Sequence, residues 1–240
     1  MTTVKSKWTD LQDGVLSRSV IIDFEGFEEK PPTLCGVLKD GEFRQVVFDE
    51  ILSPAIALTE KNEPEWLIHF EDRQKHLDNL VEMAFGENRK IIAFSKHERD
   101  VLGGKRVADI YIDALPIAKN WRKTLRPKSH KEAMKKKKDN NRRKKTSKQA
   151  RADHYDHVGT RLVDYLEELG EKVPSSHGRK KTTKWLKTVI SALEKKGDRK
   201  PLAKGQKGSW TRFLNHNKRD VEKLYVLLET ILTEYTERSC

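Results

Sequence analysis

The chain has 240 residues, a formal net charge of +12 and an isoelectric point of about 9.5. Charged residues make up 36% of it and hydrophobic residues 35%, so a core has to be concentrated in parts of the chain. The basic balance favours a polyanionic partner, nucleic acid before an anionic membrane surface, and no apolar run approaches the ~20 residues of a membrane-spanning helix.

The first residues and the cysteines bear on the compartment. Residues 1–18 are expected to form a loose polar lead-in, and they lack the apolar segment of a signal peptide. The two cysteines, Cys35 on a predicted buried strand and Cys240, are not expected to pair, and a CxxC zinc site is excluded. We therefore expect a cytoplasmic protein of a prokaryotic cell, monomeric and not bound to a membrane.

Residues 19–27 (Ser-Val-Ile-Ile-Asp-Phe-Glu-Gly-Phe) read as a buried strand that ends in two acids. Side chains alternate along a strand, so Asp23 and Glu25 point the same way and Phe24 points into the packing. Neighbouring carboxylates raise each other's pKa, and a divalent cation between them removes that cost. The alternative is a strand that ends at the surface with two solvated acids.

The elements that follow alternate between strand and helix. Residues 33–48 are typical of a hairpin around Asp40 and Gly41, so the acidic strand begins a three-stranded meander. We predict a helix from residue 62 to residue 86, a strand over 90–94, a short helix over 97–102 and a strand over 109–113. The last residue of that strand, Asp113, is interpreted as a helix cap rather than a ligand.

The composition changes at about residue 120. Residues 122–151 contain 15 lysines and arginines and almost no apolar residues, so they are expected to form a mobile segment or a solvated helix. The functional interpretation is a phosphate-binding arm, and the alternatives are a plain solvated run or a nuclear localisation signal. Its candidate contacts are Lys135, Lys136, Lys137, Lys138, Arg142, Arg143, Lys144 and Lys145. Lys180 and Lys181 lie in a second basic stretch that suits a backbone phosphate or is a plain loop.

Three helices are predicted after the basic run. One spans about 158–169, a second is capped by Thr183, and the last opens near residue 215 with Asp220 in its first turn. Asp220 lies one turn before a buried leucine, an unusual place for an unpartnered carboxylate, which favours metal binding. Trp210 and Phe213, just before that helix, are candidates for stacking on a base.

Three motifs in this order resemble the DEDD exonuclease branch of the ribonuclease H-like fold, and more narrowly the predicted RNase H-like nucleases of bacteria and archaea. They are Asp23-Phe-Glu25-Gly-Phe27, residues 93–98 (Ala-Phe-Ser-Lys-His-Glu) and residues 216–220 (His-Asn-Lys-Arg-Asp). The resemblance covers roughly residues 19–118 and 208–232. It implies an α/β protein with an RNase H-like mixed sheet flanked by helices. The nuclease domain would comprise residues 19–120 and 208–240, with residues 121–207 as a basic, mainly helical insertion.

The same resemblance implies a two-metal nuclease that hydrolyses DNA or RNA, with 3′–5′ exonuclease activity expected. Two Mg²⁺ or Mn²⁺ ions would be held by Asp23, Glu25, Glu98 and Asp220. Asp100 is close enough in sequence to replace Glu98. His216 stands four positions before Asp220, where related enzymes place a tyrosine, and it is a candidate base or orienting residue.

Other interpretations remain at this point. His216 fits neither DEDD subclass, because the second subclass spaces its histidine one residue further away, and it is alternatively a helix residue without a role. The competing class is a non-catalytic nucleic-acid-binding protein that uses its basic arm. A phosphatase acting on small substrates is disfavoured by the long basic insertion. Four acids converging on one point favour catalysis, since without a metal they would repel a phosphate backbone.

Overall fold

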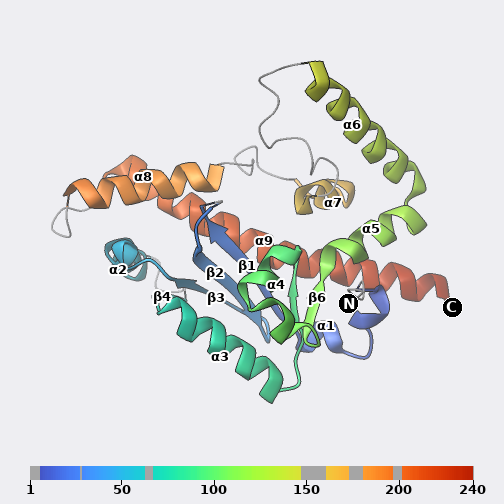
Figure 1. The fold of residues 1–240 in the computed structure, drawn as a ribbon, viewed down its shortest axis with the longest axis horizontal. Helices are drawn as coiled ribbons and strands as arrows, with labels where there is room; N and C mark the ends of the chain where they lie inside the picture. The colour runs from blue at the N-terminus through green and yellow to red at the C-terminus, as the bar shows by residue number, and fades with distance from the viewer. Residues whose placement is uncertain are drawn as a thin grey trace.

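A mixed six-stranded sheet lies at the centre of the molecule, in the order β4-β3-β2-β1-β5-β6 (Figure 1). The computed structural model describes residues 6–27, 29–62, 67–146, 161–172, 181–196 and 202–239. Its strands are β1 (Val20–Gly26), β2 (Pro32–Lys39), β3 (Glu42–Val47), β4 (Ile68–Phe70), β5 (Ile91–Ala93) and β6 (Tyr111–Asp113). The protein is therefore an α/β protein with a mixed sheet flanked by helices.

The first three strands form an antiparallel meander, as the sequence predicts. Asp40 and Gly41 both have positive φ values, 53° and 80°, which a two-residue hairpin turn requires and which glycine adopts without strain. The remaining strands pair in parallel, β5 with β1, β6 with β5 and β4 with β3. In the β1–β2 register Asp23 lies opposite Gly36, and in the β2–β3 register Gly36 lies opposite Gln45.

Helices cover both faces of the sheet, α9 along one and α3 along the other (Figure 1). The helical elements are η1 (Trp8–Leu11), α1 (Val15–Arg18), η2 (Glu50–Leu52), α2 (Ser53–Asn62), α3 (Arg73–Gly86), α4 (Lys96–Val101), η3 (Gly104–Val107), α5 (Ala114–Leu125), α6 (Pro127–Thr146), α7 (Leu162–Glu168), α8 (Lys181–Lys196) and α9 (Lys204–Ser239). Within these described residues, no helix is long and apolar enough to cross a bilayer.

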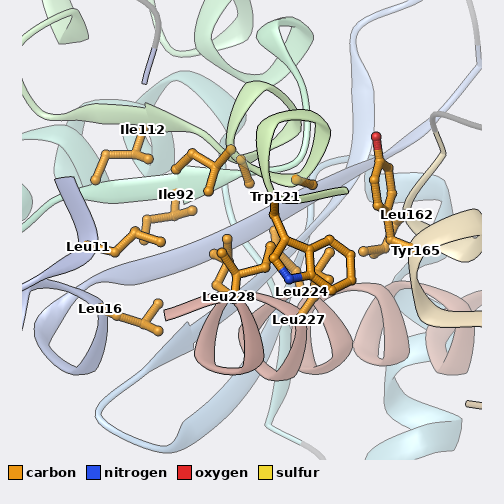
Figure 2. Close-up of a cluster of buried hydrophobic side chains, with 14 of the residues drawn as sticks. Leu11, Leu16, Ile92, Ile112, Trp121, Leu162, Tyr165, Leu224, Leu227 and Leu228 are labelled. Carbon is orange, nitrogen blue, oxygen red and sulfur yellow. The ribbon is translucent and has the colours of Figure 1, made fainter. Parts of the chain in front are cut away.

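The strand β1 divides its side chains between the two faces. Val20, Ile22 and Phe24 are buried together with the apolar stripe of α3. Ile21 is buried on the opposite face with Leu224 and other residues of α9. Figure 2 shows part of this second cluster, where Trp121 of α5 lies against the leucines of α9. Since alternate residues share a face, the acids that follow Ile21 at two-residue steps face α9.

Several element boundaries differ from the sequence predictions. The helix expected from residue 62 begins at Arg73, after Asp72, whose carboxylate accepts from the Lys75 N–H at 2.9 Å. The strand β4 before it was not predicted, because three residues with one buried side chain are too few for a periodic signal. The short helix, the strand at Ile91 and the Asp113 cap are confirmed, the cap accepting from the Leu115 N–H at 3.0 Å.

The N-terminal residues and two later helices also correct the prediction. The lead-in is not loose over residues 8–18, since Leu11 and Leu16 are buried and the Trp8 ring stacks on Tyr235 with centroids 4.8 Å apart. Thr183 lies inside α8 and does not cap it. Helix α9 begins at Lys204, not near residue 215, because tertiary packing outweighs the low helix propensity of its two early glycines.

The predicted insertion contributes to the cores of the protein. Its basic part forms the helix α6, which extends away from the sheet (Figure 1). In contrast, α7 buries Tyr165 and Leu166 against α9, and α8 buries Trp185 and Leu186 against the N-terminal part of α9.

A buried ion pair joins α5 to α7. The Arg122 side chain is 4% exposed, and its Nε donates to Glu168 Oε2 at 2.6 Å. Its Nη2 donates to the Asp164 carbonyl at 2.9 Å, and the guanidinium lies 3.7 Å from the centroid of the Tyr165 ring. The charge thus has a carboxylate, a carbonyl and an aromatic face as partners, which fixes α7 on the body of the protein.

Candidate metal centre

Three side chains from β1 and α9 place ligand atoms at one point. His216 Nδ1 lies 3.4 Å from Glu25 Oε1 and 3.3 Å from Asp220 Oδ2. All three ligand atoms lie within 4.8 Å of one another. His216 and Asp220 are four residues apart on α9 and therefore share one helix face. This group offers two carboxylate oxygens and one imidazole nitrogen.

Asp23 and Glu98 add two acids that act on this group electrostatically. Burial raises the pKa of Asp23 well above its ordinary value, and the charges of Glu25, Asp220 and Glu98 raise it further. Glu98, on α4, is 7% exposed, and burial raises its pKa although the Ser95 hydroxyl donates to its Oε2 at 2.7 Å. The charges of the three other predicted acids therefore all act on Asp23, as expected of carboxylates that bind a common cation site.

Asp100, the alternative to Glu98, lies on the other side of α4. Its side chain is 55% exposed and lies 3.9 Å from Lys96 Nζ and 3.8 Å from an Arg99 nitrogen. Asp100 is thus a solvated surface acid with cationic neighbours, whereas Glu98 is buried and raises the pKa of Asp23. Between the two, the geometry favours Glu98.

Glu25 and His216 are both strongly perturbed. Burial raises the pKa of Glu25 to about 7, helped by Asp220 and opposed by His216 and by a hydrogen bond from Thr182 of α8. Burial alone would lower the pKa of His216, but Asp220 and Glu25 outweigh it and raise that pKa to about 9. The imidazolium and the carboxylates therefore compensate one another's charge.

These shifts predict how the stability depends on pH. Asp23, Glu25, Glu98 and His216 all have raised folded-state pKa values, so these four groups bind more protons in the folded chain than in the unfolded chain. The stability that these groups contribute falls as pH rises, here from about 5 to about 9.

We expect His216→Gln to lower the free energy of unfolding by about 2 kcal/mol below pH 6.5 and by progressively less as pH approaches 9. The melting temperatures of the wild type and the variant, measured in EDTA from pH 5 to pH 9, test this prediction. A difference in melting temperature that does not change with pH would contradict it.

Asn217, which was not singled out in the sequence, connects helix α9 to Asp23 on the sheet. Its side chain is fully buried, and its Nδ2 donates to Asp23 Oδ2 at 2.9 Å and to the Asp23 carbonyl at 3.0 Å. Gln45 Nε2 donates to Asn217 Oδ1 at 3.0 Å. The sequence gave only a weak signal for these two residues. Asn217 is an amide beside His216 in the third motif, and Gln45 stands next to the apolar end of a strand.

Trp210 does not have the role predicted for it. Trp210 is 2% exposed, its Nε1 donates to Thr59 Oγ1 at 2.9 Å, and neighbouring Phe213 is fully buried. Helix α9 begins at Lys204, so both rings lie within it and pack into the core that it shares with α8. Neither ring therefore presents a face to a base. The prediction that these rings stack on nucleic acid is therefore wrong.

The predicted basic contacts are distributed unevenly. Lys135 is exposed on α6, and Lys181 is exposed at the start of α8, next to the Thr182 that bonds Glu25. Lys180 lies outside the described residues. The backbone of α6 continues through the remaining predicted contacts, whose side chains also lie outside the described part: Lys136, Lys137, Lys138, Arg142, Arg143, Lys144 and Lys145.

A groove of about 780 Å³ begins two residues beyond Glu25. Its walls come from the ends of β1 and β3, from η2 and from α8. The residues that line it include the rings of Phe27 and Phe48 and the basic side chains of Arg73 and Lys187. The sequence did not predict it, since its walls are far apart along the chain.

Comparisons of this chain with protein-family models, with curated proteins and with solved structures find no match.

Proposed function

We propose that the protein is a metal-dependent nuclease of the RNase H-like fold, of the DEDD type. The observation that carries the proposal is the meeting of Glu25, His216 and Asp220 at one point, with half-buried Asp23 within the electrostatic influence of Glu25, Asp220 and buried Glu98. Buried carboxylates that raise one another's pKa are costly, and a divalent cation offsets that cost. The mixed sheet, with its antiparallel meander and parallel strands, is compatible with the RNase H-like mixed sheet that the resemblance implies.

The donor set fits Mg²⁺ or Mn²⁺. Hard divalent cations prefer carboxylate oxygens, and the four acids supply enough oxygens for two ions, with Asp23, Glu25, Glu98 and Asp220 as the ligands. Such ions lower the pKa of a bound water and stabilise the charge that develops on a phosphodiester. His216, with its Nδ1 3.4 Å from Glu25 and 3.3 Å from Asp220, would hold a proton between these carboxylates and would act as the base or orienting residue for the attacking water.

The charge of the chain supports a nucleic-acid substrate, DNA or RNA. The chain carries a net charge of +12, and the sequence of helix α6 is rich in lysine and arginine. The groove beyond Glu25 combines the rings of Phe27 and Phe48 with three basic side chains, but Asp49, Glu50 and Glu194 also line it, so its lining is of mixed charge. Contacts of lysine and arginine with phosphates carry no sequence information, so we expect cleavage without marked sequence preference.

The direct test is cleavage of 5′-labelled single- and double-stranded DNA and RNA in Mg²⁺, in Mn²⁺ and in EDTA. We expect products only with a divalent cation, and a ladder of lengths for the 3′–5′ exonuclease that the motifs imply. Salt-sensitive binding without cleavage under any metal would overturn the proposal in favour of a binding protein that keeps the acids without using them.

The second acid motif has its own matched pair of variants. Glu98→Gln is expected to lower the cleavage rate by about a hundredfold, because it removes one charged ligand from a metal site. Asp100→Asn, two residues away on the same helix, is expected to stay within about twofold. Initial rates at saturating Mg²⁺ measure both. Equal losses in the two variants, or a larger loss for Asp100, would show that the ligand has been assigned to the wrong acid.

A further inference from the structure

Two buried amides link helix α9 to the acidic strand. Asn217 is 0% exposed and Gln45 is 1% exposed. Gln45 Nε2 donates to the Leu214 carbonyl and to Asn217 Oδ1, each at 3.0 Å. Asn217 Nδ2 in turn donates to the carboxylate and the main-chain carbonyl of Asp23. Buried amides without partners are costly, and here each has partners on its donor side.

The order of these bonds has a fixed direction. A main-chain carbonyl such as that of Leu214 can only accept, so it requires the NH₂ side of Gln45. The same NH₂ group then requires the oxygen of Asn217, which leaves the NH₂ side of Asn217 facing Asp23. If the Asn217 amide turned over, its oxygen would face the Asp23 carboxylate and be repelled. The orientation at the acid is therefore set by a residue two strands away.

The sheet makes room for this contact at Gly36. Gly36 is paired with Asp23 on one side and with Gln45 on the other. A Cβ at this position would lie 2.3 Å from Asn217 Oδ1, closer than real Cβ contacts come. Asn217 thus reaches across β2 only because the strand has no side chain there.

We propose that Asn217, oriented by Gln45, is a positioning residue that holds Asp23 Oδ2 and leaves Oδ1 as the single oxygen offered to a divalent cation. The inference rests on the proposed metal site and adds a metal preference to it. Mg²⁺ and Mn²⁺ bind in compact octahedral shells, whereas Ca²⁺ readily takes both oxygens of a carboxylate. A carboxylate with one oxygen engaged in a hydrogen bond therefore favours the smaller ions, Mg²⁺ and Mn²⁺, over Ca²⁺.

Gln45→Met gives the sharpest test, because the Gln45 side chain donates to Leu214 and Asn217 rather than to an acid, and methionine has a similar size. We expect the variant to bind Mn²⁺ about tenfold more weakly, and Asn217→Leu ten- to a hundredfold more weakly. The double variant should match Asn217→Leu, since Gln45 acts only through Asn217. Both single variants should also lose part of their preference for Mn²⁺ over Ca²⁺. Calorimetric titration of the full chain measures these affinities.

Thr59→Val is the control for a loss of packing or stability alone. Thr59 is also buried, and its hydroxyl bonds Trp210 and the Ala55 carbonyl rather than an acid, so its loss should lower the melting temperature without changing Mn²⁺ affinity. The wild-type chain supplies a readout that no folding defect can obscure. In a Mg²⁺ titration followed by NMR, the side-chain amide signals of Asn217 and Gln45 should shift together and saturate together.

The outcomes separate this inference from the proposed function. Three results would overturn the positioning role and leave the metal site standing. They are a wild-type Mn²⁺ affinity in folded Gln45→Met, a loss of affinity in the double variant equal to the product of the two single losses, and amide signals that do not shift with Mg²⁺. A wild-type chain that binds neither Mn²⁺ nor Mg²⁺ would overturn both. Mn²⁺ binding that depends on Gln45, in a protein that cleaves no nucleic acid, would support the positioning role and overturn the nuclease.

Discussion

Asp23→Asn should reduce metal-dependent cleavage by at least about a thousandfold, roughly 4 kcal/mol of transition-state stabilisation. Asp23 is a half-buried acid whose pKa is raised by each of the three other predicted ligands. An amide cannot neutralise a cation, so the variant would lose one charged ligand of the proposed metal site. Steady-state rates in Mg²⁺ and in Mn²⁺ measure the loss.

The same substitution should leave the fold intact and make the metal-free protein more stable. A neutral amide avoids both the burial penalty and the repulsion from Glu25 and Asp220, and its oxygen can still accept from Asn217. We expect a melting temperature in EDTA a few degrees above that of the wild type. Activity lost together with stability would indicate a structural role for Asp23, and a variant that retained a tenth of the activity would contradict its assignment as a ligand.

Arg122→Met should destabilise the protein by about 3–5 kcal/mol, because it leaves the buried carboxylate of Glu168 without its partner. For a chain of this size that corresponds to a fall of about 10 °C in melting temperature. Urea unfolding measured at neutral pH gives the free energy directly. Helix α7 would lose its ion pair with α5, so the loss should include local opening of that helix.

Two further variants separate the ion pair from other effects. Arg161→Met removes a more exposed pair, 2.9 Å from Asp164 on the same helix, and should cost less than about 1 kcal/mol. Combining Arg122→Met with Glu168→Leu replaces both charges by apolar groups and should recover most of the lost stability. A cost below about 1 kcal/mol for Arg122→Met alone would show that the pair contributes little net energy.

The sequence predicted those parts of the site that depend on local periodicity. Asp23 and Glu25 share a face because strand side chains alternate, and the hairpin at Asp40 and Gly41 followed from its turn residues. Glu98 lies on the predicted short helix, although only the structure separates it from Asp100. These signals need only a few neighbouring residues, so one sequence is enough to read them.

The remaining features depend on partners far along the chain. The hydrogen bond from Asn217 to Asp23 joins residues 194 positions apart, and that from Gln45 to Asn217 joins residues 172 apart. Trp210 appeared available to a base only because the start of α9 was placed too late, which concealed the core formed with α8. No periodic pattern contains such information, since the pairing is decided by how whole elements pack.

Helix α9 spans 36 residues, which corresponds to about 54 Å, and it supplies His216, Asn217 and Asp220 to a strand made near the beginning of the chain. The acids on β1 leave the ribosome long before their partners exist. Contacts of such long sequence separation form late in folding. The centre is therefore completed only after α9 has been synthesised and has docked on the sheet. If the centre is that of the proposed nuclease, a nascent chain has no complete site for cleavage while it is still next to its own messenger RNA.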